Sequence, residues 1–193
     1  FGRAAPRSRP DRIVHRRGRP VSVPVLETER LILRGHRLED FPAYAAMWAD
    51  PVFMRHMGPP RSPEESWSRF LRNMGMWSLL GHGLWAVEEK ASGAFVGDCG
   101  FMQNRRGLPI DCGDQPEAGW TFITAAHGKG IGSEASRAAI AWGDKHLDAP
   151  RTWCLIAESN QVSQKLAARM GYRQSGHVTH LDKPALIFTR ERP

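Results

Sequence analysis

The run from Pro116 to Arg137, P-E-A-G-W-T-F-I-T-A-A-H-G-K-G-I-G-S-E-A-S-R, limits most strongly what this chain can fold into. Residues 117–124 alternate in polarity and are rich in aromatic and β-branched side chains, which predicts a strand. From residue 131 onward apolar residues recur at helical spacing, which predicts a helix to about residue 147. These apolar residues are Ile131, Ala135, Ala138, Ala139 and Trp142.

Three alternating glycines lie between this strand and this helix, in the segment H-G-K-G-I-G at 127–132. Glycines let a backbone bend sharply and approach a ligand closely, and a helix start presents unpaired N–H groups and a positive dipole end. The segment therefore predicts a phosphate or pyrophosphate site. A tight turn that serves geometry alone is the alternative. The letters fit neither a Walker loop nor G-x-G-x-x-G, so the rest of the chain has to decide.

The bulk composition is that of a globular protein. A length of 193 residues favours one domain with a real core, and 41% hydrophobic and 24% charged residues are ordinary values. No apolar run approaches the ~20 residues that a membrane-spanning helix needs, so we expect no membrane partner. The three cysteines are odd in number and scattered, which favours a reducing, cytoplasmic environment over a disulfide framework. No cluster has metal-ligand spacing, so no metal site is expected.

The net charge of +7 belongs to the start of the chain. Residues 1–20 hold seven arginines and one acidic residue, Asp11, whereas the remaining chain holds 20 basic and 19 acidic residues. We therefore expect a basic, disordered leader over 1–24 and a single domain over 25–193. No nucleic-acid partner is expected for the domain. An Arg-rich arm that binds RNA or a membrane is the less favoured interpretation of the leader.

The periodicity along 25–193 predicts a single α+β domain built on a mixed sheet. Strands are expected at 31–36, 84–89, 94–102, 117–124, 152–157, 172–180 and 185–189. Helices are expected at 38–49, 63–80, 131–147 and 160–170. The segment 51–63 is expected to be an irregular link, and 103–115 a loop.

With its expected strands and helices in this order, the chain resembles the GNAT superfamily of N-acetyltransferases. Within that superfamily it resembles the branch of the ribosomal-protein N-terminal acetyltransferases. The resemblance covers roughly residues 25–190. Five pieces carry it together: E-T-E-R-L-I-L-R at 27–34, L-W-A-V-E with F-V-G-D-C-G-F, E-A-G-W at 117–120, H-G-K-G-I-G-S-E-A at 127–135, and E-S-N-Q-V-S-Q-K-L-A-A-R-M-G-Y at 158–172.

The resemblance implies a mostly antiparallel central sheet with flanking helices, and acetyl-CoA as co-substrate in a cleft where strands 117–124 and 152–157 splay apart. The pyrophosphate would lie on the backbone of 128–133. For Trp120 we favour core packing, and Asn160 has a competing role as helix N-cap. The cofactor-binding residues that it implies are Phe122, Ile123, His127, Gly128, Lys129, Gly130, Ile131, Gly132, Ser133, Asn160 and Ser163.

Acetyl transfer to an amine needs a neutral amine and a proton for the leaving thiolate. Glu117 is the candidate base, since it begins the strand beside the cleft on the same face as Gly119 and Thr121; a solvated carboxylate is the alternative. Many relatives place a tyrosine where this chain has Ala167. Ser163 matches the serine of the ribosomal-protein branch and is the candidate donor to the sulfur, although such a serine often only caps its own helix.

The leading hypothesis is an N-acetyltransferase that acts on a protein N-terminal α-amine or a small-molecule amine. The acceptor is expected to enter beside the link 51–63, the helix after it and the loop 103–115, where Arg105 and Arg106 hint at an anionic acceptor. A non-catalytic acyl-CoA-binding protein is the second hypothesis, and a nucleic-acid-binding module that uses the leader is the third. The sequence leaves open whether the protein is a homodimer.

Overall fold

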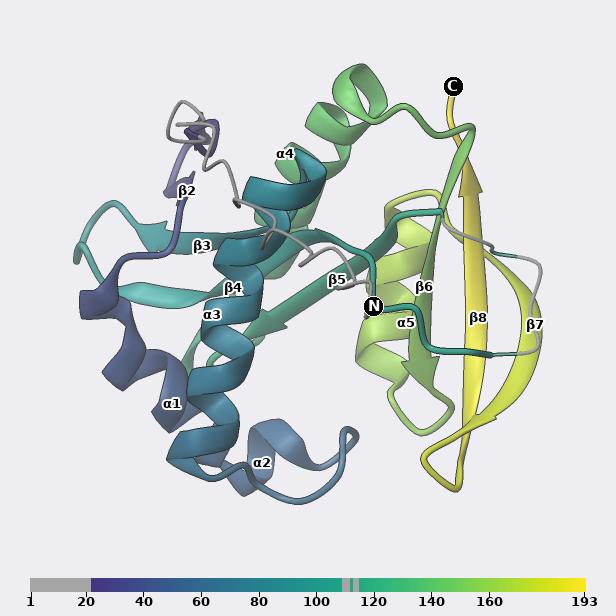
Figure 1. Ribbon diagram of the computed structural model, residues 1–193, viewed down its shortest axis with the longest axis horizontal. Coiled ribbons are helices and arrows are strands. Elements are labelled where there is room, and N and C mark those ends of the chain that lie inside the picture. The colour runs from purple at the N-terminus through teal and green to yellow at the C-terminus, as the bar shows by residue number, and fades with distance from the viewer. Residues whose placement is uncertain (1–21, 109–111, 113–114) are drawn as a thin grey trace, which may run out of the picture.

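The protein folds around one continuous sheet (Figure 1). The structure, a computed structural model, describes residues 22–108, 112 and 115–193. Within these residues eight strands pair in the order β1-β2-β3-β4-β5-β6-β8-β7. The strands are β1 (Leu26–Glu27), β2 (Leu31–Arg34), β3 (Leu84–Glu89), β4 (Phe95–Met102), β5 (Glu117–Phe122), β6 (Arg151–Ala157), β7 (Arg173–His180) and β8 (Lys183–Glu191). All neighbours are antiparallel except β5 and β6, which confirms the mixed, mostly antiparallel sheet.

Helices cover both faces of this sheet (Figure 1). They are η1 (Leu38–Asp40), α1 (Phe41–Ala49), α2 (Pro51–Met54), α3 (Pro63–Leu80), η2 (Thr124–Ala126), α4 (Ile131–His146) and α5 (Gln161–Arg169). Side chains of α1, α2 and α3 form one core with Ala86 of β3, whereas Trp85 and Val87 face the core under α4 and α5. Because the central strands are buried on both faces, β3 and β4 read as nearly continuous apolar runs.

The ends of the helices follow from local residues. Ser62 starts α3 with a capping box: its Oγ accepts from the backbone N–H of Glu65 at 3.2 Å, and Glu65 accepts from the N–H of Ser62 at 2.8 Å. Gly81 ends α3 in the left-handed region, at φ +72°. The link 51–63 is more ordered than predicted, because Asp50 caps α2 through the N–H of Val52 at 2.8 Å and a proline follows it at the first helical position.

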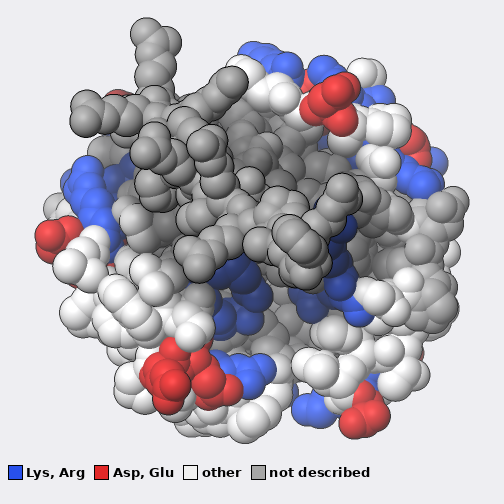
Figure 2. Space-filling model, in the orientation of Figure 1, with Lys and Arg blue, Asp and Glu red and all other residues white. Residues whose placement is uncertain are grey.

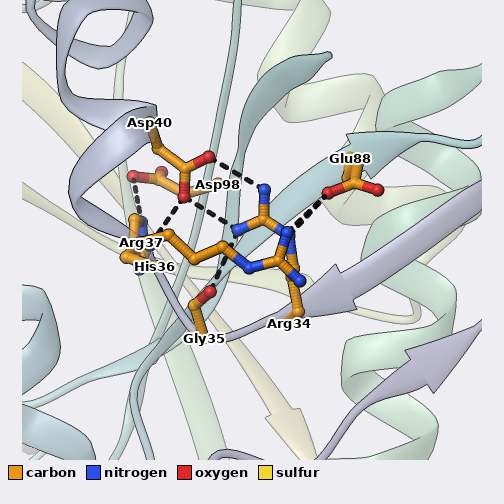
Figure 3. Close-up of polar contacts among 7 residues, drawn as sticks. All are labelled: Arg34, Gly35, His36, Arg37, Asp40, Glu88 and Asp98. Carbon is orange, nitrogen blue, oxygen red and sulfur yellow. Dashed lines mark hydrogen bonds and ion pairs between the residues drawn. The ribbon is translucent and has the colours of Figure 1, made fainter. Parts of the chain in front are cut away.

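A buried ion-pair cluster joins β2, β3 and the start of α1 (Figure 3). The guanidinium of Arg34 donates to both carboxylate oxygens of Asp40 at 2.8 Å and to Glu88 at 2.6 Å. Burial alone would raise the pKa of Asp40, but the hydrogen bonds from Arg34 and from the Arg37 N–H more than offset it and hold the pKa below its ordinary value. The cluster therefore fixes the chain where it leaves the sheet edge.

The described part of the chain begins inside the predicted leader. Trp85 donates its indole N–H to the carbonyl of Pro24 at 2.7 Å, and Val23 packs against the core. The packed domain therefore begins at or before Val23. The rest of the leader, with its arginines, lies outside the described residues. Among the helices that are described, none is both long and apolar enough to cross a bilayer.

Candidate active site

A wedge opens in the middle of the sheet between β5 and β6. The two strands share a single register pair, Glu117 with Trp153, and diverge after it. On its other side each strand is firmly held, since β5 pairs with β4 and β6 pairs with β8 along their whole lengths. The edge of β5 that faces β6 therefore has backbone groups between residues 118 and 122 that can bond an extended ligand, apart from the carbonyl of Phe122, which His127 contacts.

The predicted glycine segment lies at the wide end of this wedge, between η2 and α4. Gly128 and Gly130 both adopt left-handed backbone conformations, at φ +75° and +77°, which a side chain would strain. A Cβ at Gly128 would meet no atom within 4 Å, so the loop is open on that side. The carbonyl of Gly130 accepts from Glu134, which leaves the preceding N–H groups of the first turn for an anion.

Residues of the 27–34 motif clamp this segment from outside. The guanidinium of Arg30 donates to the carbonyl of Lys129 at 2.9 Å and to Glu134 at 2.7 Å. Glu134 also accepts from the Thr28 hydroxyl at 2.6 Å and from the Arg30 N–H at 2.9 Å. Burial would raise the pKa of Glu134, but these hydrogen bonds hold it below its ordinary value. The clamp fixes the loop and neutralises a carboxylate beside the predicted anion site.

Several predicted cofactor contacts support the loop from below. Phe122 is buried, and its ring lies 3.3 Å from where a Cβ on Gly132 would be, so it packs under the first turn of α4. His127 bonds the carbonyl of Phe122 through Nε2 at 3.0 Å. Ile123 donates its N–H to Val96 of β4 at 3.0 Å and is partly buried against both cores. The segment 127–132 is thus held in position from below. We call residues 127–133, which include Ser133, the glycine cradle.

The start of α5 faces the other side of the wedge. Asn160 is the N-cap, and its side-chain oxygen accepts from the N–H of Ser163 at 3.1 Å, so the capping role holds. The indole of Trp120 donates to the hydroxyl of Ser163 at 3.4 Å. Since an indole only donates, the hydroxyl proton of Ser163 stays available for another acceptor. Ala167 is completely buried and Trp120 packs on the core, as expected for a supporting residue.

Glu117 lies where β5 and β6 meet, and it is 3% exposed. Both of its oxygens are engaged: Arg106 donates to them at 2.8 and 2.9 Å, and Asn104 donates at 2.8 Å. Thr121, four residues further along β5, lies on the same face of the strand and donates to Asp98, which also accepts from Asn73 of α3. Glu117 therefore faces the α3 side of the sheet. A base role for Glu117 therefore requires that the ion pair with Arg106 loosen when an amine binds.

A cavity of about 250 Å³ adjoins this ion pair. We name it the arginine pocket, and its lining residues are Arg69, Arg72, Asn104, Arg106 and His180. Sequence reasoning singled out only Arg106 among them. The i, i+3 spacing of Arg69 and Arg72 on a predicted helix put both on one face, which was a usable signal. His180 gave none, because it comes from the far end of β7.

His180 bonds Arg106 through Nε2 at 3.1 Å. Burial and the charge of Arg106 lower its pKa below the ordinary histidine value, so the ring is neutral near pH 7. Trp77 and Trp85 lie in the core and not in the arginine pocket, and their rings pack edge-to-face with centroids 4.6 Å apart.

Comparisons with known proteins identify this arrangement. The family model for the acetyltransferase (GNAT) domain matches residues 30–173, about three quarters of the chain. The chain belongs to the GNAT family. The resemblance described from the sequence is thus confirmed, and the reaction of this GNAT acetyltransferase is acyl transfer with acetyl-CoA as the donor.

Individual relatives agree with the family assignment. The chain is 28% identical to the uncharacterized protein YkkB of Bacillus subtilis over 86% of this chain and 95% of that one. A solved putative GNAT-family acetyltransferase from Bordetella pertussis is 30% identical, with a TM-score of 0.78 over 87% of this chain and 99% of that one. A ribosomal-protein-S5-alanine acetyltransferase from Vibrio fischeri shares the fold at 18% identity, with a TM-score of 0.67 over 88% and 97% of the two chains.

The described residues fit acetyl-CoA. A diphosphate needs clustered N–H donors without side chains in the way, and the glycine cradle offers them. The pantetheine arm carries amides that need partners, and the unpaired edge of β5 offers a run of about 16 Å between residues 122 and 117, at ~3.3 Å per residue. An arm that starts at the cradle and follows β5 would end beside Glu117 and the arginine pocket.

Proposed function

We propose that this GNAT protein transfers the acetyl group of acetyl-CoA to a primary amine, either a protein N-terminal α-amine or the amine of a small molecule, by direct attack in a ternary complex. The observation that carries the proposal is the single register pair between β5 and β6, with the glycine cradle at the wide end of the wedge and a second cavity at its narrow end. Donor and acceptor can therefore meet from opposite sides beside Glu117.

The proposed roles follow from chemistry at the narrow end. Bound acetyl-CoA supplies a thioester: the amine nitrogen forms a bond to its carbonyl carbon, the carbon–sulfur bond breaks, one proton leaves the amine and one goes to the sulfur. Glu117 accepts the amine proton, directly or through a water, once Arg106 shifts toward the acceptor. Ser163 donates a hydrogen bond from its hydroxyl to the departing sulfur, since Trp120 uses only a lone pair of that hydroxyl, and the sulfur takes its proton from solvent.

Among the amines of proteins, the proposed acceptor is an N-terminal α-amine and not the side chain of lysine. An α-amine has a pKa of about 7.7–8.0 and is partly neutral near pH 7, whereas a lysine amine near 10.4 is almost entirely protonated. Among protein acceptors, this difference therefore favours an N-terminal α-amine over a lysine side chain.

A second candidate is a non-catalytic acyl-CoA-binding protein. It is favoured by the ion pair that occupies both oxygens of Glu117, and by the buried alanine at position 167. A thiol-release assay with acetyl-CoA and a panel of short peptides, amino acids and other small amines separates the two. The enzyme releases CoA at a rate that depends on the amine, whereas a binding protein changes its melting temperature with CoA and releases none with any amine.

A further inference from the structure

The arginine pocket carries more positive charge than the described residues neutralise. Arg106 is paired with Glu117, with a distance of 2.8 Å between Nη2 and Oε1. Arg69 and Arg72 have no carboxylate within ion-pair distance among residues 22–108, 112 and 115–193. Figure 2 shows basic side chains near the middle of this face, whereas the visible acidic side chains lie toward its rim. Within the described part of the chain, the arginine pocket thus gathers three guanidinium groups around one carboxylate, Glu117, which is paired with Arg106.

Arg69 is held in place by an aromatic ring, although no described carboxylate pairs with it. The guanidinium of Arg69 lies 4.0 Å from the ring centroid of Trp48, and its Nε is buried without a hydrogen-bond partner. Arg72 is exposed on the same helix and lines the pocket together with Arg69 and Arg106. Three guanidinium groups are thus gathered around one cavity, and a buried donor of Arg69 is left unsatisfied, as in a preformed anion site.

We propose that the acceptor of this enzyme is a small amine that carries a compact anionic group, a carboxylate or a phosphate, bound by Arg69 and Arg72 in the arginine pocket. This inference rests on the proposed function and names its substrate class. Guanidinium groups pair with both anions through two parallel N–H···O bonds, which fixes the orientation of the ligand as well as its charge. With the anion held there, the amine is directed toward the wedge beside Glu117.

The size of the pocket favours a small acceptor over an acidic segment of a protein. Its volume of about 250 Å³ is slightly below the ~300 Å³ at which typical ligand pockets begin. Five side chains from α3, the loop after β4 and the end of β7 converge on it. A site of this volume has room for one compact group rather than for a row of acidic side chains.

The test compares acceptors that differ only in charge. Thiol release is measured for an amino acid and its amide, and for phosphoethanolamine and ethanolamine, with wild-type protein and with Arg72→Gln. We expect the anionic member of at least one pair to have a kcat/KM about 10-fold higher or more, and Arg72→Gln to remove most of that preference. The amine pKa differs between paired acceptors, so the change in the ratio upon Arg72→Gln is the decisive quantity.

The controls separate binding of the acceptor from binding of the donor. Arg72→Gln should leave the Kd of CoA unchanged. Arg173→Gln, in the same strand as His180 but about 23 Å away at its other end, should keep the preference for anionic acceptors. A preference within the amino acid and amide pair indicates a carboxylate as the bound anion, whereas a preference within the phosphoethanolamine and ethanolamine pair indicates a phosphate.

Two results would overturn the inference while the proposed function stands: equal turnover of charged and neutral acceptors, or an anion preference that survives in Arg72→Gln. Turnover of acidic peptides alone would also overturn it and would favour a protein acceptor. If no amine releases thiol although CoA binds, the proposed function fails as well.

Discussion

At the scale of single residues, Glu117 can act either as the catalytic base or as a positioning residue for Arg106, and the two roles predict different effects of its removal. Glu117 forms the single register pair between β5 and β6, and its carboxylate also binds Arg106 at 2.8 Å. If it is the base, removing its negative charge affects the chemical step. If it only positions Arg106, removal affects acceptor binding instead.

Glu117→Gln keeps the size of the side chain and its hydrogen bond from Asn104. We expect kcat to fall by about 100-fold, within the range of general-base effects, and the acidic limb of its pH profile to disappear, with the Kd of CoA nearly unchanged. A variant with wild-type kcat and an unaltered pH profile, but a higher acceptor KM, would assign Glu117 a positioning role only.

The contribution of Arg34 to the stability of the fold can also be tested directly, because its guanidinium neutralises two carboxylates inside the protein. Its side chain is 7% exposed, whereas that of Arg37, which also contacts Glu88, is 61% exposed (Figure 3). Arg34→Met leaves Asp40 buried without its partner. We expect a loss of about 3–5 kcal/mol in the free energy of unfolding and a Tm lower by roughly 10 °C.

The matched control for this variant is Arg37→Met, which should change the free energy of unfolding by less than about 0.5 kcal/mol. Chemical denaturation of the three proteins measures both effects. Equal losses for the two variants would show that the buried cluster contributes no more than a surface ion pair.

At the scale of elements, the glycine cradle is the part that the sequence predicted most closely. The start of the strand, the glycines and the helix start at Ile131 are where the pattern placed them, because each depends on local backbone geometry. The strand predicted over 117–124 ends at Phe122, since the chain turns into η2 (Thr124–Ala126) before the glycines. The clamp from Arg30 and Thr28 was not predicted. Those residues were recognised only as part of a motif, and their partner Glu134 lies about a hundred positions away.

Gly130→Asp tests the cradle. At φ +77° any side chain adds strain, and an aspartate also places a negative charge beside the expected diphosphate. Repulsion of about 3 kcal/mol at ~5 Å and intermediate dielectric corresponds to roughly 100-fold weaker CoA binding. Isothermal titration with CoA measures the loss.

Gly93→Asp is the control for this change. Gly93 has φ +67° in the turn between β3 and β4, and a Cβ there meets nothing within 4 Å. It therefore carries the same backbone strain and the same charge away from the cradle, and its CoA affinity should equal that of the wild type. If both variants bind CoA alike, the cradle assignment is wrong.

The arginine pocket marks where sequence reasoning ended at this scale. Helix periodicity placed Arg69 and Arg72 on α3, but only the fold brings α3, the loop after β4 and the end of β7 together. The link 51–63 shows a smaller gap: Asp50 and Pro51 were read as the end of one helix, while the same pair also starts the next. The arginine pocket depends on contacts between distant elements, and α2 depends on a local cap at Asp50. Hydrophobic periodicity reports neither.

At the scale of the whole molecule, the stability of the fold should rise with pH through the acid range. The pKa values of His82 and His180 are lowered, chiefly by burial, so their neutral forms are favoured in the folded state. This contribution is complete above the unfolded value of ~6.5 and is lost as pH falls below it. The depressed pKa values of Asp40 and Glu134 add a second loss below about pH 4.

Melting curves between pH 8 and pH 3 should therefore show two successive decreases in Tm. His82→Gln should reduce the first decrease and leave the second in place. A Tm that is constant from pH 8 to pH 4 would contradict the assignment of neutral, partly buried histidines.

The central claim is that CoA lies with its diphosphate on the glycine cradle and its arm along β5. The most direct measurement is the Tm of the protein as CoA is added. Because CoA would bind the folded state alone, a concentration of 100 times its Kd should add about 2.7 kcal/mol to the free energy of unfolding, and Tm should continue to rise with concentration. A Tm that stays constant up to millimolar CoA would contradict the account.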